Sequence, residues 1–153
     1  MMNKLIYPVT VCCLCFLIFP VSRKGSADIS CKADVSYLWN EERLDLLISQ
    51  DLDHGKGVIS VSGISYISGK PESYLNKSIS FSYLQHNDFY TFRSEMIMDS
   101  PQMTMSVSEQ RKWLPAFFIK TDEKMLLKIR PYGKNSWLFY SANNPLLVCE
   151  KNR

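Results

Sequence analysis

Residues 78–83 read Ser-Ile-Ser-Phe-Ser-Tyr, and this short stretch decides the fold class of the chain. Apolar or aromatic side chains alternate with serines, so one face of the segment is apolar and the other carries hydroxyls. A period of two residues is typical of a strand with one buried face, because successive side chains of a strand point to opposite sides of the sheet. Residues 85–88 then form a turn into residues 89–98, which predicts a β-hairpin.

The same alternation continues on both sides of this hairpin. Upstream, three segments predict strands, separated by turns at 40–42 and 51–57 and followed by a loop at 68–73. Their ranges are 31–39, 44–48 and 58–67. Downstream, four further short strands are predicted, at residues 117–120, 125–130, 137–141 and 146–150.

Residues 99–114 break the alternation. Ser106 and Glu109 have the spacing of a capping box, which predicts a short helix that runs to Trp113 and is ended by Pro115. Eight or nine short strands with one helix predict an all-β domain, either a small antiparallel β-barrel or a sandwich of about eight strands. Consecutive hairpins favour a meander over a Greek key.

An apolar run precedes this domain at residues 5–21. As a helix it would extend about 25 Å, which is short for a transmembrane helix and long for the core of a signal peptide. Small residues at 25–27 suit signal-peptide cleavage, whereas the positive charges of Arg23 and Lys24 argue against it. Both alternatives stay open, with an N-terminal hydrophobic helix in either.

The chain is therefore divided into residues 1–27, a signal peptide or membrane anchor, and residues 28–153, a periplasmic β domain. The expected location is the inner membrane facing the periplasm, or the soluble periplasm if the leader is cleaved after Ala27. If the leader is not cleaved, the inner membrane is contacted through residues 5–21.

The charge of the domain gives no indication of nucleic-acid binding. The formal net charge of +3 comes from Lys4, Arg23 and Lys24, and the rest of the chain holds 15 basic and 15 acidic residues. These charges are interspersed, and no basic stripe interleaved with aromatic residues is present. No nucleic-acid partner is expected.

Cys31 and Cys149 lie at inward-facing positions of the first and last predicted strands. A disulfide between them would tie the two ends of the domain together and stabilise it by about 4–5 kcal/mol at most. The alternative is a pair of unrelated buried thiols, but export into an oxidising compartment favours the disulfide.

Catalytic and metal chemistry find little support in the sequence. Only two histidines occur, His54 and His86, and both fall in predicted turns, where solvated surface histidine is expected. Asp51 and Asp53 accompany His54, but a metal site needs more ligands than one short turn supplies. No Gly-x-Ser-x-Gly motif and no glycine-rich phosphate loop are present. We expect a non-enzymatic protein without cofactor or metal.

The aromatic residues admit two interpretations. They either fill a packed core, or they line the cavity of a lipocalin-like barrel that binds a small apolar ligand such as a bile salt or fatty acid. The candidate lining residues are Tyr37, Trp39, Phe81, Tyr83, Phe92, Trp137 and Phe139.

Several segments resemble a known family. These are CKADVSY from Cys31, GKGVISVSG from Gly55, SISFSY, LPAFF from Leu114, LKIRPYG from Leu127 and the late Cys149. Together they resemble the FidL-like membrane proteins of enterobacteria, over nearly all of residues 28–150.

The resemblance implies an inner-membrane-associated protein with a periplasmic domain and no assigned enzymatic activity. Members are often encoded beside membrane-spanning winged-helix regulators, which suggests a role like that of ToxS-type accessory proteins. The resemblance therefore implies a protein that binds and modulates the periplasmic domain of such a regulator. Alternatives are the apolar-ligand binder and a structural protein of the envelope.

Overall fold

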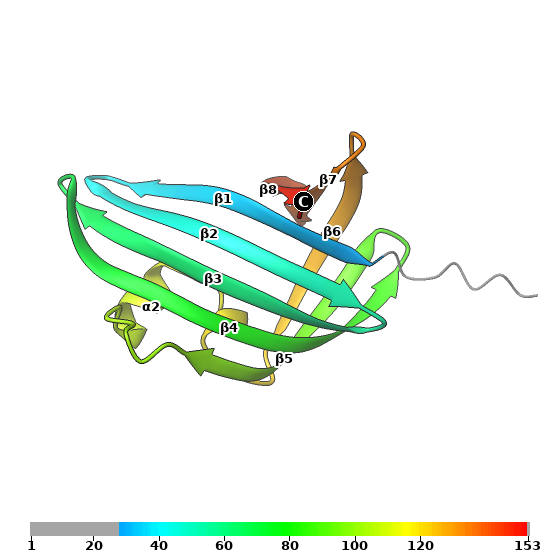
Figure 1. Cartoon of the computed structure of the whole chain (residues 1–153), viewed down its shortest axis with the longest axis horizontal. Helices are drawn as coiled ribbons and strands as arrows, with labels where there is room; N and C mark the ends of the chain where they lie inside the picture. The colour runs from blue at the N-terminus through cyan, green and yellow to red at the C-terminus, as the bar shows by residue number, and fades with distance from the viewer. Residues whose placement is uncertain (1–27, 153) are drawn as a thin grey trace, which may run out of the picture.

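A computed structural model describes residues 28–152 as a closed barrel of eight antiparallel strands, each paired with the next in sequence (Figure 1). The strands are β1 (Ile29–Trp39), β2 (Glu42–Asp53), β3 (Lys56–Ile67), β4 (Lys70–His86), β5 (Phe89–Asp99), β6 (Lys124–Tyr132), β7 (Ser136–Ser141) and β8 (Asn144–Lys151). The predicted all-β barrel and its meander order are confirmed, and the sandwich alternative is wrong. The predicted hydrophobic helix at residues 5–21 lies outside the described residues.

The connection between β5 and β6 contains the short helix α2 (Val107–Trp113), close to the predicted position. The Ser106 hydroxyl accepts a hydrogen bond from the Glu109 backbone N–H at 3.2 Å, as the capping-box spacing predicts. The prediction of a strand at 117–120 is wrong, because the chain forms a 3₁₀ turn, η2 (Ala116–Phe118). This turn buries the neighbouring Phe117 and Phe118 together, whereas a strand would point them to opposite sides.

The predicted loop at 68–73 is also wrong. Only Ser68 and Gly69 form the turn, both with positive φ, and β4 starts at Lys70. Pro71 lies in the first part of β4, which among the described residues has a ladder only with β3. An edge strand tolerates proline, because the missing N–H can face away from the ladder.

Aromatic rings fill the part of the barrel that β4, β5 and η2 surround. Phe81 stacks on Phe92 with ring centroids 4.5 Å apart, and Phe117 packs on Phe81 at 5.8 Å. Gly57 makes room for this cluster, because a Cβ there would lie 2.4 Å from the Cζ atom of Phe81. The apolar face predicted for residues 78–83 therefore faces the interior of the barrel.

A short ladder and the expected disulfide close the barrel. β1 and β8 pair only at Cys31↔Lys151 and Lys32↔Glu150. A disulfide joins Cys31 to Cys149, and both cysteines are fully buried. First and last strands are thus joined at one end of β1 only.

Within residues 28–152, none of the helices combines the length and the apolar character that a membrane crossing requires.

Candidate functional site

The candidate site is a gap in the barrel wall between β1 and β8, which we call the seam. β1 pairs with β2 along its whole length, but residues 33–39 have no ladder partner on the β8 side among the described residues. Continued pairing would place Asp34 opposite Val148, and a hollow of about 540 Å³ lies there instead. It would also place Tyr37 opposite Pro145, whose nitrogen has no hydrogen to donate.

Exposure along the inward side of β1 shows where the seam widens. Cys31 is 0% exposed, Ala33 4%, Tyr37 36% and Trp39 61%. These side chains share one face of the strand, so they would all be buried if β8 covered the whole of β1. The increase in their exposed fraction therefore reflects the missing contact with β8. At the widest point, Leu38 on the outer face of β1 is 76% exposed.

An apolar cavity of about 500 Å³ lies in the barrel behind the seam. None of its lining side chains carries a charge, and the polar ones are Tyr37, Gln50 and Ser141. Gln50 marks the closed end, because its Nε2 lies 3.5 Å from Sγ of Cys31 and 3.4 Å from Sγ of Cys149. Partial burial raises the pKa of the Tyr37 hydroxyl, so this group stays neutral and able to donate a hydrogen bond.

The candidate lining residues divide into three groups. Tyr37 and Phe139 line the cavity. Phe81, Tyr83 and Phe92 belong to the packed aromatic cluster, and Trp137 is half-buried against the core. Trp39 does not lie in the lining and is mostly exposed, because β8 does not cover its end of β1.

Part of the cavity wall comes from residues outside the set of candidate lining residues. Leu114, Pro115 and Phe118 contribute to the lining, and we call residues 114–118 the plug. The run LPAFF could have indicated this, because a strand cannot bury two adjacent phenylalanines on the same side.

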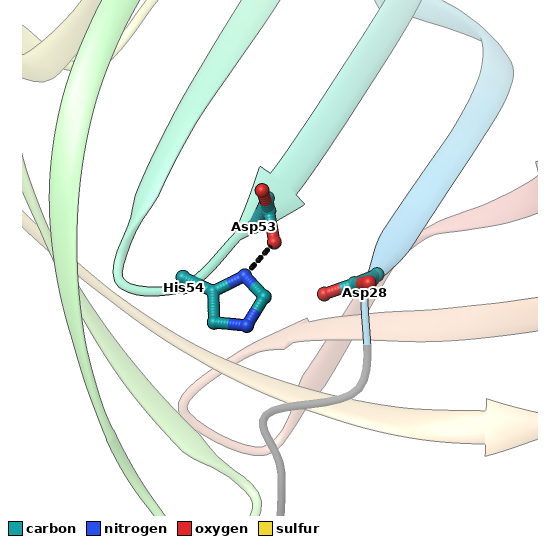
Figure 2. A group of neighbouring side chains, drawn as sticks. All are labelled: Asp28, Asp53 and His54. Carbon is teal, nitrogen blue, oxygen red and sulfur yellow. Dashed lines mark hydrogen bonds and ion pairs between the residues drawn. The ribbon is translucent and has the colours of Figure 1, made fainter.

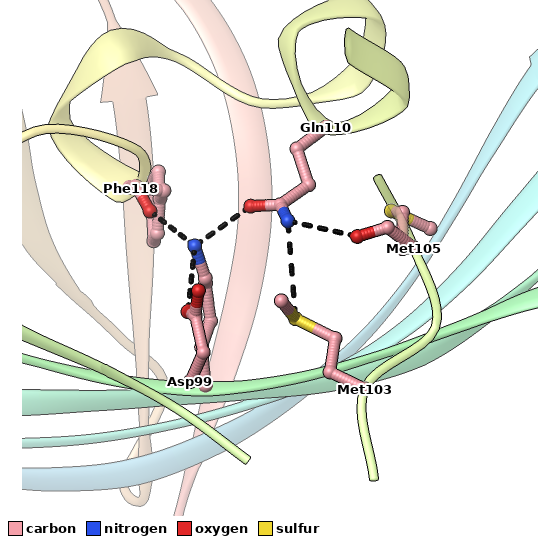
Figure 3. Close-up of polar contacts among 6 residues, drawn as sticks. Asp99, Met103, Met105, Gln110 and Phe118 are labelled. Atoms are coloured by element: carbon pink, nitrogen blue, oxygen red, sulfur yellow. Dashed lines mark hydrogen bonds and ion pairs between the residues drawn. The ribbon is translucent and has the colours of Figure 1, made fainter. Parts of the chain in front are cut away.

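A buried lysine holds the plug in place (Figure 3). Lys77 is 3% exposed, and its Nζ donates to Oε1 of Gln110 at 2.7 Å and to the carbonyl oxygen of Phe118 at 2.9 Å. The same ammonium pairs with Asp99 Oδ1 at 3.1 Å. The alternation of residues 78–83 extends back to Lys77 and places it inward, so its burial was readable from the sequence.

A second polar contact fixes α2 on the sheet. Oε1 of Glu109 accepts hydrogen bonds from the hydroxyls of Ser65, at 2.8 Å, and Ser73, at 2.7 Å. Since Ser65 lies on β3 and Ser73 on β4, the helix is attached to both strands.

His54 lies at the opposite end of β2 from the wide part of the seam. It pairs with Asp53, and Asp28 lies beside them, with ligand-type atoms of all three within 4.8 Å of one another (Figure 2). Asp51, which the sequence grouped with them, is not among these three. The hydrogen bond that the His54 imidazole donates to Asp53, the charge of Asp53 and that of Asp28 raise the pKa of the imidazole. All three residues are exposed, as expected for a surface histidine.

Comparisons with known proteins give one finding. The family model of the YqeJ C-terminal domain matches residues 28–149, from the start of the barrel to the second cysteine of the disulfide. A search of curated proteins finds no match.

Proposed function

We propose, from the premise that this chain belongs to the YqeJ C-terminal domain family, that it is a non-enzymatic accessory protein. In this proposal it is membrane-associated, faces the periplasm, and binds and modulates the periplasmic domain of a membrane-bound winged-helix regulator. The resemblance to FidL-like membrane proteins supports the regulator as partner. The observation that carries the proposal is the edge of β1 at residues 33–39, which has no ladder partner within residues 28–152.

An unpaired strand edge presents backbone N–H and C=O groups that a strand of another polypeptide can pair with. The β1 edge also has the side chains that protein contacts favour. Tyr37 and Trp39 are partly exposed aromatic residues, and Leu38 is more exposed than either. Aromatic anchors of this kind contribute most of the binding energy in many interfaces.

The β8 side of the seam adds to this surface. Leu146 is 43% exposed and Val148 is 42% exposed, and both lie on β8. A partner segment placed in the seam would therefore contact apolar side chains on both of its sides.

The disulfide supports a periplasmic location of the domain. A bond between Cys31 and Cys149 is expected to persist in an oxidising space such as the periplasm and to be rare in the cytosol. The partner domain is therefore sought in the periplasm.

Co-purification of the full chain from solubilised membranes, with any membrane-bound winged-helix regulator that is encoded beside it, tests the proposal. Trp39→Ser is expected to reduce the recovered regulator several-fold. Met98→Ser changes a residue of similar exposure, 50%, on β5 and is expected to leave recovery unchanged. Equal recovery with both variants would exclude the seam as the contact, and no regulator with the unaltered chain would exclude the proposal.

A second candidate is a lipocalin-like carrier or sensor of a small apolar ligand such as a bile salt or fatty acid. The cavity of about 500 Å³ favours it, because ligand sites commonly hold about 300–1,000 Å³ and are mostly apolar. Displacement of an environment-sensitive dye by taurocholate or palmitate would test it. Ile59→Trp, which fills the cavity, should abolish displacement. A chain that binds neither regulator nor ligand would instead be a structural protein of the envelope.

A further inference from the structure

We propose that the end of the barrel where β1 begins rests on the surface of a phospholipid bilayer. The side chains of Leu84, Phe89 and Tyr132 would lie in the interfacial layer. This inference rests on the membrane-associated part of the proposed function, and it adds which surface of the domain meets the lipid.

Three hairpin turns gather at this end of the barrel (Figure 1). The β2–β3 turn contacts β4, because Tyr83 N–H donates to the Gly55 carbonyl at 2.8 Å. The β4–β5 turn contacts β6, since Ile129 N–H donates to the Asp88 carbonyl at 2.8 Å. These turns thus form one continuous end of the barrel.

The β6–β7 turn and the start of the domain belong to the same end. Lys151 N–H donates to the Asn135 carbonyl at 2.8 Å, and Lys151 pairs with Cys31 near the start of β1. Asp28 lies beside the β2–β3 turn, within reach of Asp53 and His54 (Figure 2).

Large apolar side chains lie on the strands next to these turns. Leu84 is 78% exposed, Phe89 45% and Tyr132 57%. The opposite end also exposes apolar groups, Leu38 and Trp39 among them, so exposure alone does not choose between the two ends.

The length of chain between the apolar run and the domain favours the end where β1 begins. Residues 22–27 separate the run at 5–21 from Asp28. Six residues span about 20 Å at most when fully extended. With 5–21 in the bilayer, the start of β1 is held within that distance. β1 has 11 residues and is about 35 Å long. Because strands of such barrels tilt by about 35–45°, an upright barrel places the opposite end about 25 Å further away.

The charges of this end also suit a headgroup layer. Lys128 and Arg130 on β6 and Lys134 in the β6–β7 turn supply cations, and Lys128 Nζ lies 5.6 Å from the ring centroid of Phe89. Basic and aromatic side chains at one level are typical of membrane interfaces.

Acidic groups limit how strongly this end attracts anionic lipid. Asp88 is paired with Arg130 at 2.9 Å, and Asp28 and Asp53 lie near His54 on the β1–β2 side. The apolar side chains and the short connection, more than net charge, therefore set the orientation.

Amide NMR of the full chain in nanodiscs of phosphatidylethanolamine and phosphatidylglycerol tests the inference. A fraction of the lipid carries a paramagnetic headgroup, which broadens amides close to the bilayer. We expect several-fold stronger broadening at residues 84–89 and 131–135 than at residues 40–41 and 68–69 of the opposite end. Equal broadening at both ends, or stronger broadening at the opposite end, would overturn the inference.

Two triple variants separate lipid contact from tethering alone. Replacing Leu84, Phe89 and Tyr132 by serine should lower the broadening at their turns to that of the opposite end. The control replaces Leu47, Ile64 and Met96, which are 44%, 37% and 49% exposed on the outer wall, and should leave it unchanged. Loss of broadening only in the control would mean that the barrel lies on its side, which contradicts the inference.

The two proposals can fail separately. If the full chain from intact cells is recovered as a soluble protein cleaved near Ala27, the membrane association fails and this inference fails with it. If the chain stays in the disc but its turns are no closer to lipid than the opposite end, only the orientation is wrong.

Discussion

Lys77 shows how one buried polar residue can organise a wall of the barrel. Its ammonium group contacts β5 through Asp99, α2 through Gln110 and η2 through Phe118. Lys77→Met would keep most of the side-chain volume but leave the Gln110 and Phe118 oxygens without this donor.

We expect Lys77→Met to lower the free energy of unfolding by about 1–3 kcal/mol, the cost of leaving buried polar groups unsatisfied. Urea denaturation measures the change. Lys70→Met alters an exposed lysine on the same strand and should change stability by less than about 0.5 kcal/mol. Similar losses in both variants would show that the buried contacts of Lys77 contribute nothing specific.

His54 gives a pH-dependent prediction at the same scale. Hydrogen bonding to Asp53 is the largest cause of its raised pKa, so Asp53→Asn should shift the imidazole titration to lower pH in an NMR experiment. The raised folded-state pKa contributes stability that is complete below the unfolded pKa, about 6.5, and is lost as pH rises through the folded value. An unchanged titration in Asp53→Asn would contradict this pairing.

At the scale of elements, the two ends of β1 differ in how they are paired. Among the described residues, 33–39 have a ladder partner only on the β2 side. We expect the amides of this segment that point away from β2 to exchange hydrogen much faster than those that point toward it, because only the latter are held in a ladder. Uniform protection along β1 would show that the seam is closed in solution.

The matched comparison is β2, which pairs with both β1 and β3. Its amides should be protected on both sides. Addition of the regulator's periplasmic domain should protect the exposed amides of residues 33–39 if the proposed partner binds there.

The elements also show what the sequence could and could not predict. Alternation located most strands, because one-sided burial imposes a period of two along each of them. It failed at η2, where Phe117 and Phe118 are both buried and no alternation exists. Alternation also failed to predict the exposure of Trp39. This residue is at an inward-facing position, but its burial depends on whether β8, far along the chain, covers that end of β1. The cavity depends both on the position of η2 and on the incomplete pairing of β1 with β8. Its extent therefore could not be predicted from the alternation of residues along single segments.

At the scale of the whole molecule, the disulfide is the main constraint on closure. It joins residues 118 positions apart, next to the two residue pairs of the β1–β8 ladder. The double variant Cys31→Ser, Cys149→Ser should lower the free energy of unfolding by about 2–5 kcal/mol.

Thermal or urea denaturation of the oxidised and double-variant proteins measures that loss. A Cys12→Ser, Cys13→Ser, Cys15→Ser variant removes the other cysteines and serves as control, with unchanged stability of the domain expected. Equal stability of the double variant and the unaltered chain would show that the short ladder alone is sufficient to close the barrel.

The position of the crosslink has a mechanical consequence. Because the covalent bond and both ladder pairs lie at the Cys31 end of β1, β1 and β8 can separate only by pivoting about that end. Displacement then grows with distance from the pivot and is greatest at Trp39. The width of the seam therefore depends on one angle between β1 and β8, while the disulfide-bonded end keeps the same geometry.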